Sequence, residues 1–232
     1  MIYKNLLAAA VLSVLPLSVP SAKADTIAYS TSNTTGNQTF TGNLGLDFNV
    51  LKPIYVTALG AYDSSQNGIN PAITVGIFSR LPGTGSPNSD VAGVLVGSTK
   101  TISGNGDPLI GGYRFVSLAT PFYLVPGAYT IDAVGFGSGN PDGNENIANF
   151  SISTDTGGNL VQYVGTGRFD TNTTFDYPAQ SSANQGYPNL SSHPFAGGSF
   201  EFVAAPLPWS ASSGLILLAT AGFWKLRTRK LA

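Results

Sequence analysis

The chain has 232 residues, a formal net charge of −1 and a charged fraction of only 10%. It contains no cysteine and a single histidine, His193. These counts exclude disulfides, a thiolate nucleophile and a zinc site built from cysteines or several histidines. His193 precedes a proline in a loop-like segment without Ser-His-Asp spacing, so we interpret it as a loop residue rather than a catalytic base.

The charges are unevenly distributed along the chain. Residues 25–203 contain five basic and twelve acidic residues, a net charge of −7, whereas the other six basic residues lie in the two terminal segments. An acidic domain repels phosphate backbones and gains no counterion-release energy from them. Nucleic acid is therefore not expected as a partner.

The N-terminus has the pattern of a secretory signal peptide. One cation, Lys4, precedes an apolar stretch over 6–19 that is shorter than the ~20 residues of a membrane-spanning helix. Pro20 ends the stretch, and Ala22-Lys23-Ala24 offers the small residues at alternating positions that signal peptidase requires. We therefore predict a signal peptide over 1–24 and an exported protein. The alternative is an uncleaved N-terminal anchor.

Residues 25–203 are predicted to form one all-β domain. Apolar residues alternate along short stretches that are separated by Gly, Pro, Asn and Ser. Leu44, Leu46, Phe48 and Val50, for example, share one face of an extended strand. The predicted fold class is an antiparallel β-sandwich of jelly-roll type. The expected strands cover residues 44–50, 54–62, 72–80, 91–101, 113–118, 128–136, 147–153, 160–164 and 199–203.

A polar loop in the second half of the domain has the spacing of the opening of a calcium loop. Asp142, Asn144 and Asn146 alternate, with Glu145 beside them, and oxygen ligands at alternate positions can converge on a hard cation. The loop lacks the glycine at the sixth position and the distal bidentate glutamate. A plain polar turn is therefore the alternative, and no other cofactor is indicated. A second, weaker oxygen cluster is formed by Asp63, Asn67 and Asn70.

The stretch from 163 to 195 combines aromatic residues with Asn and Gln and lacks a clear strand pattern. Aromatic rings that are exposed on loops can stack on sugar rings, so this stretch predicts a glycan contact. The alternative is that the same rings belong to the core. The aromatic candidates are Tyr163, Phe169, Phe175, Tyr177 and Tyr187.

No set of residues predicts an enzyme. Glu145 and Glu201 are the only glutamates, and glycoside hydrolysis needs two carboxyl groups at a separation that a sequence does not reveal. Glu201 alternates with Phe200 and Phe202 in the last expected strand, which places its side chain on the solvent side. No nucleophile, base or metal set accompanies these carboxylates, so we do not expect an enzyme.

Residues 204–232 are predicted to form a membrane anchor or sorting segment. The motif Pro206-Leu207-Pro208 leads into an apolar stretch, and a helix over 207–224 would rise about 27 Å, close to the ~30 Å of a hydrocarbon core. Trp209 and Trp224 stand near its two ends, where indole rings favour the membrane interface. The alternative is an apolar final strand with a solvated tail. Four cations within the basic tail, 225–230, favour a cytoplasmic C-terminus before any processing: Lys225, Arg227, Arg229 and Lys230.

Several stretches resemble, in the same order, a group of uncharacterised exported bacterial proteins. The stretches cover residues 56–63, 67–69, 74–78, 111–116, 126–131 and 197–202. The resemblance implies a β-sandwich related to domains that are found beside carbohydrate-active modules. The C-terminal segment, with Pro206-Leu207-Pro208 and the later run over 223–227, resembles the PEP-CTERM sorting signal in the variant common in cyanobacteria. Leu207 stands where the glutamate of Pro-Glu-Pro would be, and the resemblance implies an exosortase-type processing enzyme as a partner.

Together these patterns predict an exported protein of the cell envelope or extracellular matrix with a structural or interaction role. The membrane and an exosortase-type enzyme are its expected partners, and the tail would anchor or sort it. A carbohydrate-binding module for extracellular polysaccharide is the first alternative, and a secreted hydrolase is the second.

Overall fold

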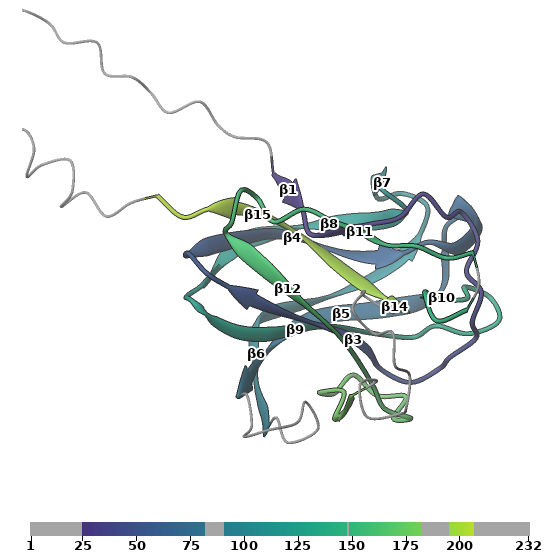
Figure 1. The fold of residues 1–232 in the computed structure, drawn as a ribbon. Helices are drawn as coiled ribbons and strands as arrows, with labels where there is room; N and C mark the ends of the chain where they lie inside the picture. Colours follow the sequence, from purple (N-terminus) through teal and green to yellow (C-terminus); the bar gives the residue numbers. More distant parts are fainter. Residues whose placement is uncertain (1–24, 82–90, 148, 182–194, 207–232) are drawn as a thin grey trace, which may run out of the picture.

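The computed structural model describes residues 25–81, 91–147, 149–181 and 195–206, and these residues form an all-β structure. Two antiparallel sheets lie one above the other (Figure 1). In the described part of the chain, helical structure is limited to one 3₁₀ turn, η1 (Ser64–Gln66). The predicted all-β class with antiparallel sheets is confirmed.

The larger sheet has six strands in the order β13-β12-β3-β9-β5-β6. Their bounds are β3 (Leu44–Val50), β5 (Ile69–Leu81), β6 (Val91–Gly104), β9 (Gly127–Val134), β12 (Val161–Phe169) and β13 (Gln180–Ser181). Strand β13 pairs only with Arg168 and Phe169 of β12. The first half of β12 is therefore an edge of the sheet within the described residues.

The smaller sheet has five strands in the order β1-β15-β4-β8-β7. Their bounds are β1 (Thr26–Ile27), β4 (Ile54–Tyr62), β7 (Leu109–Ile110), β8 (Tyr113–Leu124) and β15 (Gly198–Ala204). Two further short pairs join β2 (Tyr29–Ser30) to β11 (Ser153–Thr154) and β10 (Gly143–Asn144) to β14 (Phe195–Ala196). The last of the described strands, β15, lies inside the smaller sheet, between β1 and β4.

The core lies between the sheets because apolar side chains alternate along the strands. Leu44, Leu46, Phe48 and Val50 of β3 are all buried, as period-two alternation predicts. Phe200 of β15 faces them from the smaller sheet, and its ring centroid lies 4.8 Å from that of Phe48. Full burial of a large apolar side chain contributes about 1.5–3 kcal/mol, so this layer can stabilise a domain without disulfides.

The outer face of the larger sheet carries buried charge. The Nε of Arg168 in β12 lies 2.8 Å and 2.9 Å from the two carboxylate oxygens of Asp47 in β3, and both residues are buried. Thr130 of β9 donates its hydroxyl to Asp47, and Nε of Arg80 in β5 lies 3.6 Å from the same carboxylate. The ring of Tyr177 lies over the Arg168 guanidinium at 5.5 Å. The segment after β12 thus covers this face.

Most predicted strands are found in place but differ in length. Strands β3 and β4 have the predicted bounds. Strand β9 ends at Val134, two residues before the predicted end, because Gly135 leaves the extended conformation with a φ of 119°. Strands β8 and β12 run beyond their predicted ends, to Leu124 and Phe169.

The predicted strand over 147–153 is wrong. Within the described residues of that segment, only Ser153 joins a strand pair, as the first residue of β11. Asn149 has a φ of 70°, and the backbone N–H of Ser151 donates to the Asn33 side chain rather than to a neighbouring strand. Side chains here satisfy the backbone groups that a ladder would otherwise pair.

Several predicted features lie outside the described residues. These are the signal peptide over 1–24, the apolar stretch over 207–224, the basic tail over 225–230, and the residues His193 and Tyr187. Across the described ranges, no helix is long and apolar enough to cross a membrane.

Candidate functional site

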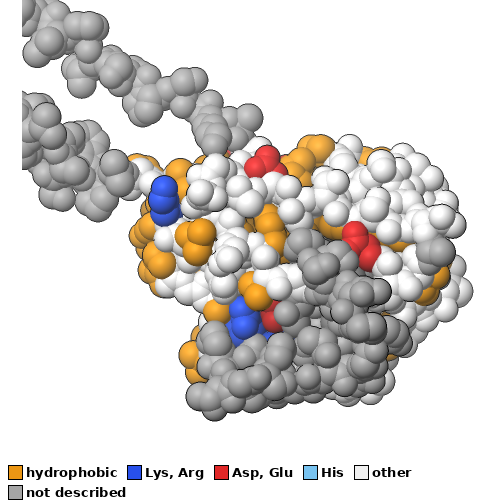
Figure 2. Space-filling model, viewed as in Figure 1, with side chains coloured by type: hydrophobic (Ala, Val, Ile, Leu, Met, Phe, Trp, Pro, Cys, Tyr) orange, Lys and Arg blue, Asp and Glu red, His pale blue; other side chains and the backbone are white. Residues whose placement is uncertain are grey.

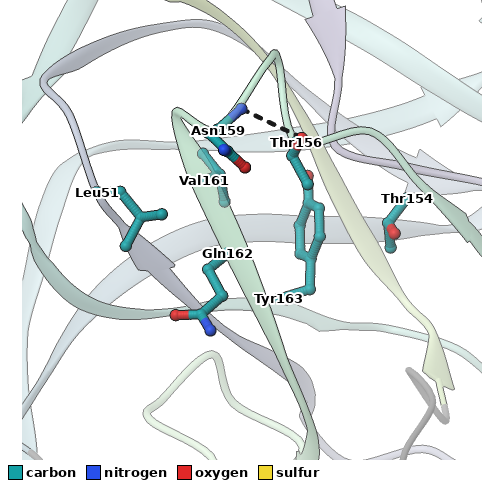
Figure 3. A pocket seen from close by; sticks show the side chains of 7 residues that line it. All are labelled: Leu51, Thr154, Thr156, Asn159, Val161, Gln162 and Tyr163. Atoms are coloured by element: carbon teal, nitrogen blue, oxygen red, sulfur yellow. Dashed lines mark hydrogen bonds between the residues drawn. The ribbon is translucent and has the colours of Figure 1, made fainter.

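An open hollow of about 380 Å³ lies at the free edge of β12 (Figure 3). Side chains from the turn after β3, from β11 and the loop that follows it, and from β12 itself line it. It is lined by Leu51, Thr154, Thr156, Asn159, Val161, Gln162 and Tyr163. None of these lining side chains is charged at neutral pH, so the hollow suits an uncharged, hydroxyl-bearing ligand better than an ion.

The loop before β12 forms one wall of the hollow. The backbone N–H of Leu160 donates to the carbonyl of Thr156, and the N–H of Asn159 donates to the Thr156 hydroxyl. Asn159 has a φ of 67°, a conformation that asparagine tolerates better than most residues. Leu51 is held against this loop because its N–H donates to the Leu160 carbonyl at 2.8 Å.

Tyr163 of β12 lines the hollow with a partly exposed ring. Its ring centroid lies 4.8 Å from that of Tyr29, and its hydroxyl donates to the Asp155 carbonyl at 2.7 Å. Burial raises the pKa of Tyr163 above its ordinary value, and nearby Asp155 raises it further. The ring is therefore neutral and fixed in orientation, and its half-buried position leaves part of it facing the hollow.

The other predicted aromatic contacts pack within the domain. Phe169 is half-buried between Phe40 and Phe195. Phe175 stacks on Phe78 of β5 with centroids 5.3 Å apart, and Tyr177 meets the same ring edge-on at 5.8 Å. The structure brings Phe175 and Tyr177 together over the outer face of the larger sheet, whereas Tyr163 lies apart from them. Tyr187 lies outside the described residues.

The oxygens of the predicted calcium loop point into the chain. Asp142 is buried, and its Oδ1 accepts a hydrogen bond from the N–H of Phe40 at 3.1 Å. Burial raises the pKa of Asp142 to about 7. The Oδ1 of Asn144 accepts from the N–H of Asn146 at 2.8 Å, and its Nδ2 donates to Gln38 at 2.8 Å. This geometry is that of an Asx turn that ties the loop to residues 37–40.

The second oxygen cluster is an ion pair. Asp63 is buried and accepts a hydrogen bond of 2.6 Å from Nε of Arg114, while the N–H of Gly68 also donates to it. Arg114 in turn donates to the backbone carbonyls of Asn105 and Asp107. Among the residues that the structure describes, no three carboxylate, histidine or cysteine side chains are grouped so as to hold a metal ion.

The two glutamates occupy different environments. Glu201 lies in β15 between the buried Phe200 and Phe202, and its own side chain is half-buried on the opposite face, as alternation predicts. Burial raises the pKa of Glu201, and nearby Asp25 raises it further. Glu145 accepts a short hydrogen bond from the backbone N–H of Ile152. Glu145 thus has a structural role in the loop.

Sequence reasoning missed an exposed aromatic pair on the smaller sheet. Tyr55 of β4 lies directly opposite Tyr123 of β8, their ring centroids are 5.3 Å apart, and both are exposed. The signal was present, because Tyr55 stands between the buried residues Ile54 and Val56 and must therefore face outward.

Comparisons with known proteins add no relative to this picture. The chain matches no protein-family model, no curated protein and no solved structure.

Proposed function

We propose that the chain is an exported, membrane-tethered or tail-sorted β-sandwich with a structural or interaction role at the cell envelope or in the extracellular matrix. The observation that carries this proposal is the pairing of the first and last strands. Thr26 of β1 lies opposite Phe202 of β15, so the described chain begins and ends at the same corner of the sandwich (Figure 1). A domain with this arrangement can be attached through one corner while the rest of its surface stays free.

The strand order supports assignment of the sandwich to the jelly-roll class. Eight strands carry the order when the two-residue strands β7 and β13 and the nine-residue strand β12, which flanks β3, are set aside: β1, β3, β4, β5, β6, β8, β9 and β15. If these eight strands are numbered 1 to 8 in chain order, their spatial order is 1-8-3-6 in the smaller sheet and 2-7-4-5 in the larger sheet. That is the order of two interlocked Greek keys, an architecture used by lectin and capsid domains.

The proposed route to the envelope uses both termini. The signal-like segment over 1–24 would direct export, and the apolar stretch over 207–224 would hold the C-terminus in the membrane. Pro206-Leu207-Pro208 would then be the site at which an exosortase-type enzyme recognises the tail. No catalytic role is part of this proposal.

Mass spectrometry of the protein from its native host tests this proposal. We expect an N-terminus at Asp25 and a C-terminus either near Pro208, for a sorted protein, or at Ala232, for a permanent anchor. Separation of cell fractions should place the chain in the envelope or outside the cell. A cytoplasmic protein that retains Met1 would refute the proposal.

A second candidate function is the binding of a neutral polysaccharide in the hollow beside β12. It is favoured by the uncharged amide and hydroxyl side chains that line the hollow together with Tyr163. Titration calorimetry with neutral oligosaccharides would test it with Gln162→Ala, which removes an exposed lining amide. Gln66→Ala is the matched control, because Gln66 is also exposed but lies in η1, away from the hollow. Equal heats for both variants and the wild type would reject this candidate.

A further inference from the structure

Exposed apolar side chains gather at the end of the sandwich where the chain leads into its C-terminal segment. Leu51 is 47% exposed, Tyr55 36%, Tyr123 47% and Val125 53%. Figure 2 shows hydrophobic side chains along the left margin of the domain, below the place where the described chain leaves it. We name these four residues the tail-proximal rim.

Strand register places the rim residues together. Tyr55 pairs with Val203 near the end of β15 and, on its other side, with Tyr123 of β8. Val125 follows directly after β8. Leu51 lies in the turn between β3 and β4, and the next residues of that turn contact the departing chain, because the N–H of Ala205 donates to the carbonyl of Pro53 at 3.0 Å.

The rim departs from what a solvated sheet face requires. An antiparallel sheet with one face in water usually carries polar residues on that face. Here an exposed pair between β4 and β8 consists of two tyrosines, Tyr55 and Tyr123, and the segments beside them expose Leu51 and Val125. Lys52 is also exposed next to Leu51. Tyrosine rings, aliphatic side chains and a flexible lysine are the combination that lies favourably at a membrane interface.

The chain beyond the rim indicates what covers it. Strand β15 ends at Ala204, and the apolar stretch of the sequence begins at Leu207. Three residue steps of extended chain cover at most about 11 Å. If the stretch after Leu207 enters a bilayer, the rim cannot lie far from the surface of that bilayer.

We propose that the tail-proximal rim rests on the lipid interface of the membrane that receives the tail, and so fixes the orientation of the sandwich on that membrane. This inference rests on the proposed function of a tail-anchored domain. The two tyrosine rings and the two aliphatic side chains enter the headgroup region, and Lys52 contacts anionic headgroups. The opposite end of the sandwich, with β7 and η1, then faces away from the membrane.

Single cysteines can test the inference because the chain has none of its own. The full chain would be reconstituted in vesicles of phosphatidylcholine and phosphatidylglycerol, with an environment-sensitive nitrobenzoxadiazole label on one cysteine. Leu51→Cys and Val125→Cys place the label on the rim. Ile110→Cys and Ile147→Cys are the controls, since both side chains are about as exposed, at 42% and 41%, and belong to β7 and to the segment after β10, at the other end of the sandwich from the end of β15 (Figure 1).

We expect a blue shift of emission and strong quenching by nitroxide lipids for the two rim labels only. In the Tyr55→Ser/Tyr123→Ser background, quenching of the label at position 125 should fall while flotation with the vesicles stays unchanged. The matched background is Ile110→Ser, which should leave quenching as in the wild type. Circular dichroism would confirm that every variant keeps its strand content.

The outcomes separate this inference from the proposed function. Flotation with equal, weak quenching at all four positions would overturn the rim inference and leave the anchor intact. Failure to float would refute both. Rim labels that are shielded without lipid quenching, and that quench one another as protein density rises, would show contact between two copies and would also overturn it.

Discussion

Arg168 and Asp47 join neighbouring strands through a hydrogen-bonded ion pair that solvent does not reach. The Nε of Arg168 lies within 2.9 Å of both Asp47 oxygens, and neither side chain is more than 1% exposed. Loss of one partner from a buried pair leaves an uncompensated charge, which is more costly than loss of a contact on the surface. Replacement of one residue of the pair therefore tests whether the outer face of the larger sheet is buried.

Replacement of Asp47 should strongly destabilise the domain. We expect Asp47→Asn to lower the free energy of unfolding by about 3–5 kcal/mol, because Arg168 and Arg80 would then share no carboxylate. Thermal unfolding of the full chain in mild detergent should show a midpoint lower by roughly 10 °C. Lys52→Gln, at an exposed position, should change stability by less than about 0.5 kcal/mol. Similar midpoints for the two variants would contradict the buried-pair interpretation.

The stability of the domain should depend on the ionisation of Asp142. Burial raises its pKa from 3.8 to about 7 in the folded state, so between these values the folded chain holds a proton that the unfolded chain has lost. Asp142 therefore contributes stability below about pH 4 that is lost as the pH rises to about 7, at up to about 1.4 kcal/mol per pH unit.

Asp142→Asn isolates this contribution because the amide does not titrate. We expect the difference in unfolding free energy between the wild type and this variant to change between pH 4 and pH 7 and to be constant above it. Asp132 and Glu201, whose pKa values are also raised by burial, remain in both proteins and cancel in the difference. A difference that is flat from pH 4 to pH 8 would count against a buried, proton-holding Asp142.

Gly135 should not tolerate a side chain. Its φ is 119°, and an added Cβ would lie 2.4 Å from the carbonyl oxygen of Ala72. We expect Gly135→Ala to destabilise the domain by about 1–3 kcal/mol from backbone strain alone, with the clash added to it. Gly106→Ala is the control, because its Cβ would meet no heavy atom within 4 Å. Chemical denaturation of both variants, with equal midpoints, would contradict the close approach at Gly135.

The cations of the tail should determine its topology. Changing Lys225, Arg227, Arg229 and Lys230 together to glutamine should reduce the fraction of chains with a cytoplasmic C-terminus, because the positive-inside bias depends on these charges. An Ala232→Cys background, labelled with a membrane-impermeant maleimide, measures that fraction. Lys52→Gln/Lys100→Gln removes charge from the β-domain instead and should leave the topology unchanged. The tail hypothesis fails if both sets of changes give the same labelling.

The strands were predictable where apolar residues alternate regularly and a proline or glycine marks the end of the segment. Apolar residues alternate along 44–50 and along the start of 54–62, Pro53 separates the two segments, and both strands have the predicted bounds. Alternation alone could not reveal that side chains would replace strand pairing near Asn149 and Ser151. It also could not show that Gly135 ends β9, because glycine fits both a strand and a positive φ.

The candidate sites were less predictable because the spacing of residues in the sequence does not show which way their side chains point. Asp142 and Asn144 have the spacing of cation ligands, yet both turn their oxygens to backbone N–H groups of the chain. Phe175 and Tyr177 lie after β12 in a stretch without strand alternation. Only the tertiary structure shows that Phe175 stacks on Phe78 and that Tyr177 lies over the buried Arg168. Tyr55, by contrast, could have been found from its outward position in a regular strand.

The position of β15 has a consequence for how the molecule is made. Among the described strands, β15 is the last to leave the ribosome, yet its place is between β1 and β4. Until it arrives, both of those strands present open edges, and the smaller sheet cannot close. Contacts so distant in sequence also form slowly. The smaller sheet can therefore close only after residues 198–204 have been synthesised, and a chain truncated before residue 198 should remain open to aggregation and proteolysis.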